Sequence, residues 1–75
     1  MAIKISLHAK QRIMERGLTE QQVRHFFETN EGLLSVETSD RDSTVSVMEA
    51  MINGRKYRLI CNLIDDVLVT VYPLK

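Results

Sequence analysis

The chain has 75 residues, a formal net charge of zero, one cysteine and an apolar fraction of 44%. These values fit one small globular domain over residues 1–75 and argue against disorder, and a lone cysteine excludes an intramolecular disulfide. A neutral chain also lacks the basic excess of general nucleic-acid binders, so an RNA-directed role would need a local basic patch. Without a signal peptide or a bilayer-spanning apolar run, we expect a cytoplasmic protein with no membrane partner.

The N-terminal segment predicts a short extended stretch followed by a helix. Ile3 and Ile5 alternate with a lysine, as in an edge strand or an extended lead-in. Ser6 is a suitable N-cap for a first helix over residues 7–16. Gly17 then fits the left-handed position at which many helices end.

A second helix is expected over residues 20–30. Thr19 and Gln22 have the spacing of a capping box, which marks the start of this helix. His25 projects from the polar side and is interpreted as a surface residue. The opposite, core-facing side consists of Val23, Phe26 and Phe27.

The remaining sequence predicts four antiparallel strands, over residues 33–38, 44–52, 55–64 and 67–72. Asn53-Gly54 is a strong signal for a two-residue hairpin loop, and Asp65-Asp66 is interpreted as a second one. Pro73 is expected to stop the last strand. The predicted fold is therefore α+β, with two N-terminal helices on a four-stranded antiparallel meander.

These hairpins imply a register for the sheet. Glu49 would face Arg58 as a cross-strand ion pair, whereas Cys61 would lie between Ser46 and Thr70 in a row of small polar side chains. Both faces of this sheet would be apolar, and two helices can cover only one of them. The other face would be covered by a second copy in a homodimer, or would remain an exposed patch.

The first helix carries the strongest candidate for a functional site. At about 100° per residue, His8, Arg12 and Glu15 fall on one stripe with Arg16 beside it. This stripe is not the side that must be buried. Two interpretations remain open: it lines the rim of a cleft, or it is a solvated side with charge pairs at helical spacing.

RNA cleavage through the 2′-hydroxyl would suit these residue types. The reaction needs a base, an acid, and a cation for the charge that develops on phosphate. His8 can exchange a proton near neutral pH, and Arg12 offers a planar fork for phosphate. Thr70 and Tyr72 could add hydrogen bonds, but nothing in the sequence selects Glu15 or Tyr72 as a second acid. No metal-ligand spacing or cofactor motif is present, so neither is expected.

The sequence also resembles a known family. The ending Val69-Thr70-Val71-Tyr72 resembles the family's last strand, and its N-terminal signature matches at Ser6, His8, Ala9, Arg12, Glu15, Arg16, Gly17 and Thr19. The family is a bacterial and phage domain of unknown function, number 4258, grouped with ribonuclease toxins of the RelE, barnase, EndoU and colicin type. The resemblance implies a RelE-like fold and a metal-independent endoribonuclease acting on RNA. It implies active residues His8, Arg12 and Thr70, with Arg16 as a phosphate contact oriented by Glu15.

Two functions are therefore weighed. The first is a toxin-type ribonuclease, for which an antitoxin is the expected protein partner. The second is a non-catalytic module of the same fold, cellular or phage-encoded, that binds a target protein as an inhibitor or adaptor. The neutral charge and the two-sided apolar sheet favour the second.

Overall fold

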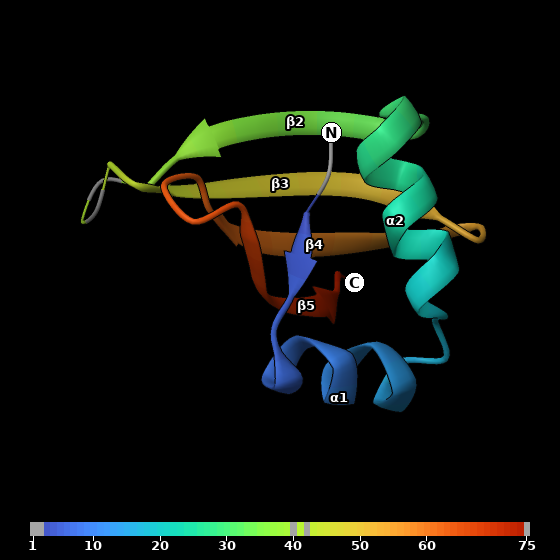
Figure 1. Ribbon diagram of the computed structural model, residues 1–75. Helices are drawn as coiled ribbons and strands as arrows, with labels where there is room; N and C mark the ends of the chain where they lie inside the picture. The colour runs from blue at the N-terminus through green and yellow to red at the C-terminus, as the bar shows by residue number, and fades with distance from the viewer. Residues whose placement is uncertain (1–2, 40, 42, 75) are drawn as a thin grey trace.

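The computed structural model describes residues 3–39, 41 and 43–74. Two helices lie on a five-stranded mixed sheet whose strand order is β1-β5-β4-β3-β2 (Figure 1). Strands β2 to β5 form an antiparallel meander, and β1 joins β5 in parallel. The elements in chain order are β1 (Lys4–Ile5), α1 (Leu7–Glu15), α2 (Glu20–Thr29), β2 (Leu33–Thr38), β3 (Val45–Ile52), β4 (Arg55–Asn62) and β5 (Val67–Pro73).

The α+β class is confirmed, but the prediction of four antiparallel strands is wrong, because the N-terminal segment adds a parallel strand. Lys4 lies opposite Val67 and Ile5 lies opposite Leu68. The amide of Lys4 donates to the carbonyl of Asp66 at 2.8 Å. A two-residue strand cannot specify its partner through its own side-chain pattern; this pairing is non-local and depends on where α1 docks.

Both helices begin at the predicted N-caps. The hydroxyl of Ser6 accepts from the amide of Ala9 at 3.0 Å. Thr19 and Gln22 form the reciprocal capping box, with bonds of 3.1 and 2.9 Å. Each helix ends one residue before its expected limit because the final residue acts as the C-cap.

The two predicted hairpins differ in outcome. At Asn53-Gly54 both residues have positive φ, 54° and 80°, as the predicted two-residue loop requires. The loop predicted at Asp65-Asp66 is longer, spanning residues 63–66, because β4 already ends at Asn62, opposite Val67. The side-chain oxygen of Asn62 accepts from two amides of the turn, at 2.9 and 3.1 Å, and so holds this wider turn in place.

The wider turn and a bulge in β5 together change the predicted row of polar side chains. Ser46 lies opposite Cys61 as expected, but Cys61 lies opposite Leu68, and Thr70 lies opposite Ile60. One extra residue, Val69, is accommodated between these pairs, which reverses the side of the sheet that Thr70 occupies. The predicted contact between Cys61 and Thr70 is therefore wrong.

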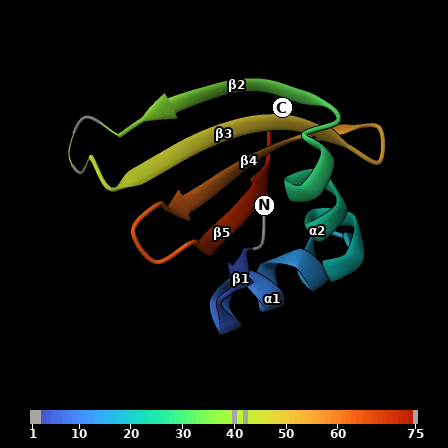
Figure 2. The same cartoon turned by 45° about the horizontal axis from the view of Figure 1, so that its top comes forward.

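The helices cover one face of the sheet, here called the inner face, and leave the other, the outer face, uncovered (Figure 2). Together with the N-terminal segment they bury an apolar core of Ile3, Ile5, Ala9, Ile13, Leu18, Val23, Phe26, Phe27, Met48, Ala50, Ile52, Tyr57, Leu59, Cys61, Leu68 and Val71. The outer face carries the half-buried side chains of Val45, Val47, Glu49, Arg58, Ile60, Thr70 and Tyr72.

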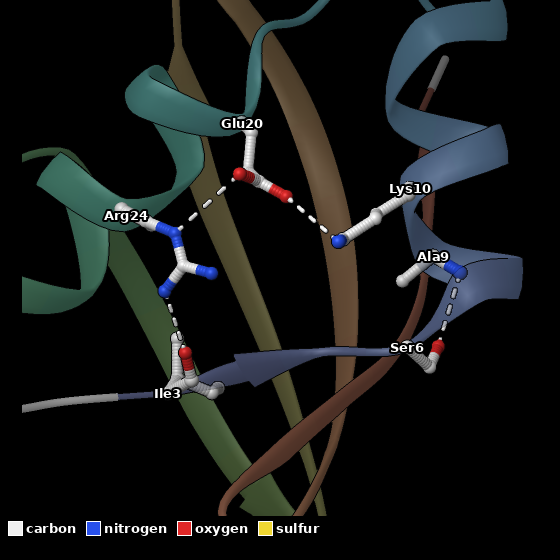
Figure 3. Close-up of polar contacts among 6 residues, drawn as sticks. All are labelled: Ile3, Ser6, Ala9, Lys10, Glu20 and Arg24. Carbon is white, nitrogen blue, oxygen red and sulfur yellow. Dashed lines mark hydrogen bonds and ion pairs between the residues drawn. The ribbon is translucent and has the colours of Figure 1, made fainter.

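A polar chain joins the elements that cover the inner face. Lys10 of α1 lies 3.7 Å from Glu20 of α2, and Glu20 lies 3.8 Å from Arg24 (Figure 3). Arg24 in turn donates to the carbonyl of Ile3 at 2.8 Å. These contacts link α1 to α2, and α2 to the N-terminal segment.

Candidate functional site

Helix α1 runs beside the second half of β5. At its start, Ser6 donates through its amide to Leu68 and through its hydroxyl to Val69, each at 3.2 Å. At its end, the hydroxyl of Tyr57 donates to the carbonyl of Arg16 at 3.3 Å, and Tyr57 lies opposite Pro73 in the sheet. At the usual rise per residue, α1 and the part of β5 from Val69 to Pro73 are each about 13 Å long. The two elements therefore lie alongside each other in the same direction, as Figure 1 also shows.

The two flanks of α1 have different surroundings. Lys10 reaches Glu20, so its flank faces α2 (Figure 3). At about 100° per residue, His8 and Arg12 each lie about 160° around the helix from Lys10. Ala9 and Ile13, which are buried, lie between Lys10 and Arg12. His8 and Arg12 thus share the flank that is turned away from α2.

The candidate residues on this flank are accessible. His8, Glu15 and Arg16 are exposed, and Arg12 is partly buried. The Nη1 of Arg12 lies 2.8 Å from Oε2 of Glu15, which is the ion pair that the solvated interpretation of this stripe expected. Within the described residues, no hydrogen bond or ion pair joins His8 or Arg12 to Thr70.

Thr70 and Tyr72 lie on the outer face of β5, and Arg58 holds Tyr72 in place. Nη1 of Arg58 donates to the Tyr72 hydroxyl at 3.4 Å, and its guanidinium carbon is 5.8 Å from the centre of the Tyr72 ring. Nη2 donates to Glu49 at 3.1 Å, so the predicted ion pair is confirmed. Hydrogen bonds to Tyr72 and Glu49 raise the pKa of Arg58 above its usual value.

The role of Arg58 beside Tyr72 was missed from the sequence. The pair arises because the wider turn and the bulge together change the β5 register and bring Tyr72 opposite Arg58. The predicted two-residue hairpin without a bulge places Arg58 correctly opposite Glu49 but does not place Tyr72 opposite Arg58. No simple signal in the sequence marks Val69 as the extra residue.

Two hollows lie elsewhere on the molecule. The larger, of about 430 Å³, lies between α2 and the β3–β4 turn, where His25, 3.3 Å from Glu31, and Phe26 contribute to the wall. A second, of about 400 Å³, lies beside Lys10 and Leu18. Neither is lined by any of the residues predicted for catalysis.

The described part of the chain contains no group of three or more His, Cys, Asp and Glu side chains arranged to hold a metal ion. Cys61 is buried, and desolvation raises the pKa of its thiol to about 12. The thiol is therefore protonated near neutral pH and is a poor nucleophile. Neither described helix has the length and apolar character that crossing a bilayer requires.

Comparison with known proteins gives one match. Residues 5–73 match a family model described as a domain of unknown function (DUF4258). No curated protein and no solved structure matches the sequence. The family description states no reaction, and so a proposal about function must come from the residues themselves.

Proposed function

This chain belongs to the family described as a domain of unknown function (DUF4258), and from the geometry of α1 we propose that it is a metal-independent endoribonuclease of a toxin-type module. The observation that carries the proposal is the pair His8 and Arg12 on an accessible flank of α1, beside β5 and turned away from α2. A RelE-like ribonuclease fold is part of this proposal.

The proposed substrate phosphate binds beside Arg12. The described contacts of Arg12 use only Nη1, and its remaining guanidinium donors can serve a phosphate oxygen. Arg16, the C-cap residue of α1, supplies a second cation. These two arginines, with His8, would form the local basic patch that a chain of zero net charge needs for RNA.

The proposed reaction is a transesterification. The 2′-oxygen bonds to phosphorus as its proton passes to a base, and the bond from phosphorus to the 5′-oxygen breaks as that oxygen receives a proton. The products are a 2′,3′-cyclic phosphate and a 5′-hydroxyl. His8 takes one proton-transfer role, and Arg12 stabilises the phosphorane charge. Glu15 orients Arg12, with which it forms the 2.8 Å ion pair. Thr70 and Tyr72 lie on the outer face of β5, the face that α1 does not cover, and would contact the RNA beyond the scissile phosphate.

The test is cleavage of a labelled RNA by the wild type, His8→Ala and Arg12→Ala, with the product ends identified. We expect the wild type to give 2′,3′-cyclic phosphate ends, also when EDTA is present. Each variant should lose at least about 100-fold in rate, the usual contribution of one acid–base or electrostatic group.

Two other exposed residues of the helices provide matched controls. Lys10→Ala removes a cation from the opposite flank of α1, and His25→Ala removes the other histidine, which is exposed on α2. Both should cleave as the wild type does, under the same purification. Cleavage that is equal in all five proteins, or absent from all, would remove the assignment.

A second candidate function rests on the outer face of the sheet. The half-buried apolar side chains of Val45, Val47 and Ile60 are covered by neither α1 nor α2. A non-catalytic module could bind a protein there. Capture of one partner in a fixed ratio, abolished by Val47→Glu and unchanged by His8→Ala, would favour this function over RNA cleavage.

A further inference from the structure

Strand β2 forms an open edge of the sheet. It is the last strand in the order β1-β5-β4-β3-β2, whereas β1 and α1 lie along the opposite edge. Its side chains Leu34 and Val36 are 52% and 54% exposed. Glu37 is the only charged residue of the strand, and no lysine or proline protects it. An edge strand of this composition is suited to pairing with another strand.

The hydrogen bonds to β3 show which backbone groups of β2 remain unpaired. Just beyond β2, the amide of Ser39 donates to Val45 at 2.9 Å, so residue 39 is directed toward β3. In an antiparallel pair the hydrogen-bonded positions alternate, so Glu37 and Ser35 are also directed toward β3. Val36 and Thr38 therefore present their backbone N–H and C=O groups outward, away from the sheet.

We propose that β2 pairs antiparallel with β2 of a second copy, about a two-fold axis at Val36. Outward-directed residues must face outward-directed residues, which restricts the possible registers. Centring the pair on Val36 places Glu37 opposite Ser35 of the partner subunit, and the regular pairing ends at Leu34, where a bulge interrupts the register of β2 with β3. Each exposed Val36 then meets its own symmetry mate in an apolar cross-strand pair.

The charges of β2 fit this register. With Val36 on the axis, Glu37 lies opposite Ser35 of the partner subunit, so each carboxylate faces a hydroxyl that can donate to it. The two Glu37 side chains are kept apart on either side of the axis. Because β2 can pair with itself without placing like charges opposite each other, a second copy of the chain is favoured over an unrelated peptide as its partner.

The proposal is independent of RNA cleavage, because β2 lies at the sheet edge opposite α1. It is tested by sedimentation velocity of the full chain over a range of concentrations. The probes are Val36→Lys and Val36→Glu, alone and mixed in equal amounts. Because the Val36 side chain is half exposed and its N–H does not bond to β3, both variants should stay folded by circular dichroism.

We expect the wild type to form a dimer, and each variant alone to dimerise at least about fivefold more weakly because like charges meet on the axis. The equal mixture should regain the dimer, since lysine then meets glutamate. Val36→Pro, which removes an outward N–H, should be a folded monomer, while Val36→Thr should dimerise.

Three results would overturn the proposal. They are a wild type that stays monomeric at high concentration, variants that dimerise as the wild type does, and a mixture no more dimeric than its components. A dimer that is insensitive to Val36 but lost in Val47→Glu would instead assign the contact to the outer face.

Discussion

The hydroxyl of Ser6 joins α1 to β5: it donates to the main-chain oxygen of Val69 at 3.2 Å and accepts from the amide of Ala9 at 3.0 Å. One side chain thus begins the helix and fixes that start against the strand. The flank with His8 and Arg12 depends on this junction for its position beside β5.

Ser6→Ala should lower the free energy of unfolding by about 2 kcal/mol, because it removes an N-cap and a tertiary hydrogen bond together. Urea denaturation followed by circular dichroism measures the change. Ser6→Asp separates the two contributions, since a carboxylate caps the helix but cannot donate to Val69. If Asp and Ala at this position were equally destabilising, the cap would contribute nothing.

Gly32 should tolerate no side chain. Its φ is +84°, and an added Cβ would lie 2.3 Å from the backbone oxygen of Met51, a backbone atom that cannot move without disturbing β3. Gly32→Ala should therefore cost at least about 3 kcal/mol, from backbone strain and the clash with Met51. Gly17→Ala, at φ +75° with open space around it, controls for the strain alone and should cost about 1 kcal/mol. Equal losses in the two variants would show that the clash is relieved.

Local chemistry explains which parts of the fold could be predicted from the sequence. The caps at Ser6 and Thr19 and the hairpin at Asn53-Gly54 each depend on residues within four positions, and all three are confirmed. The pairing of β1 and the bulge at Val69 depend on contacts between distant segments. The alternation of Ile3 and Ile5 predicted an edge strand or an extended lead-in but not its parallel pairing with β5, and an extra valine leaves no periodic signal, so the pairing and the bulge were missed.

The residues of the candidate site were also predictable only where their position depends on local geometry. Helical spacing correctly placed His8 and Arg12 on an unburied stripe of α1, because that geometry is local. Thr70 was assigned to the face of Cys61, and only the bulge moves it to the outer face. A shift of one residue reverses every side chain that follows, which is why strand-based site residues are harder to predict than helix-based ones.

Cys61 should make stability depend on pH above about 9. Burial raises the pKa of its thiol from 9.0 to about 12, so the folded chain retains a proton that the unfolded chain loses. The contribution of the buried, protonated thiol to the free energy of unfolding is fully present below pH 9 and is lost as the pH rises through 12. Unfolding free energies should therefore fall more steeply between pH 9 and 12 for the wild type than for Cys61→Ala, which removes the titrating group. Parallel pH profiles for the two proteins would contradict this assignment.

Arg24→Ala should loosen the N-terminal segment. The guanidinium of Arg24 donates to the carbonyl of Ile3 at 2.8 Å, and this bond secures the residue just before β1 against α2 (Figure 3). Its loss should cost about 1 kcal/mol and speed hydrogen exchange at the amide of Lys4, which bonds to Asp66. Lys10→Ala is the matched control, since it removes only an exposed ion pair at 3.7 Å and should change stability by less than about 0.5 kcal/mol. Protection at Lys4 that is equal in both variants would mean that β1 is secured by its apolar side chains alone.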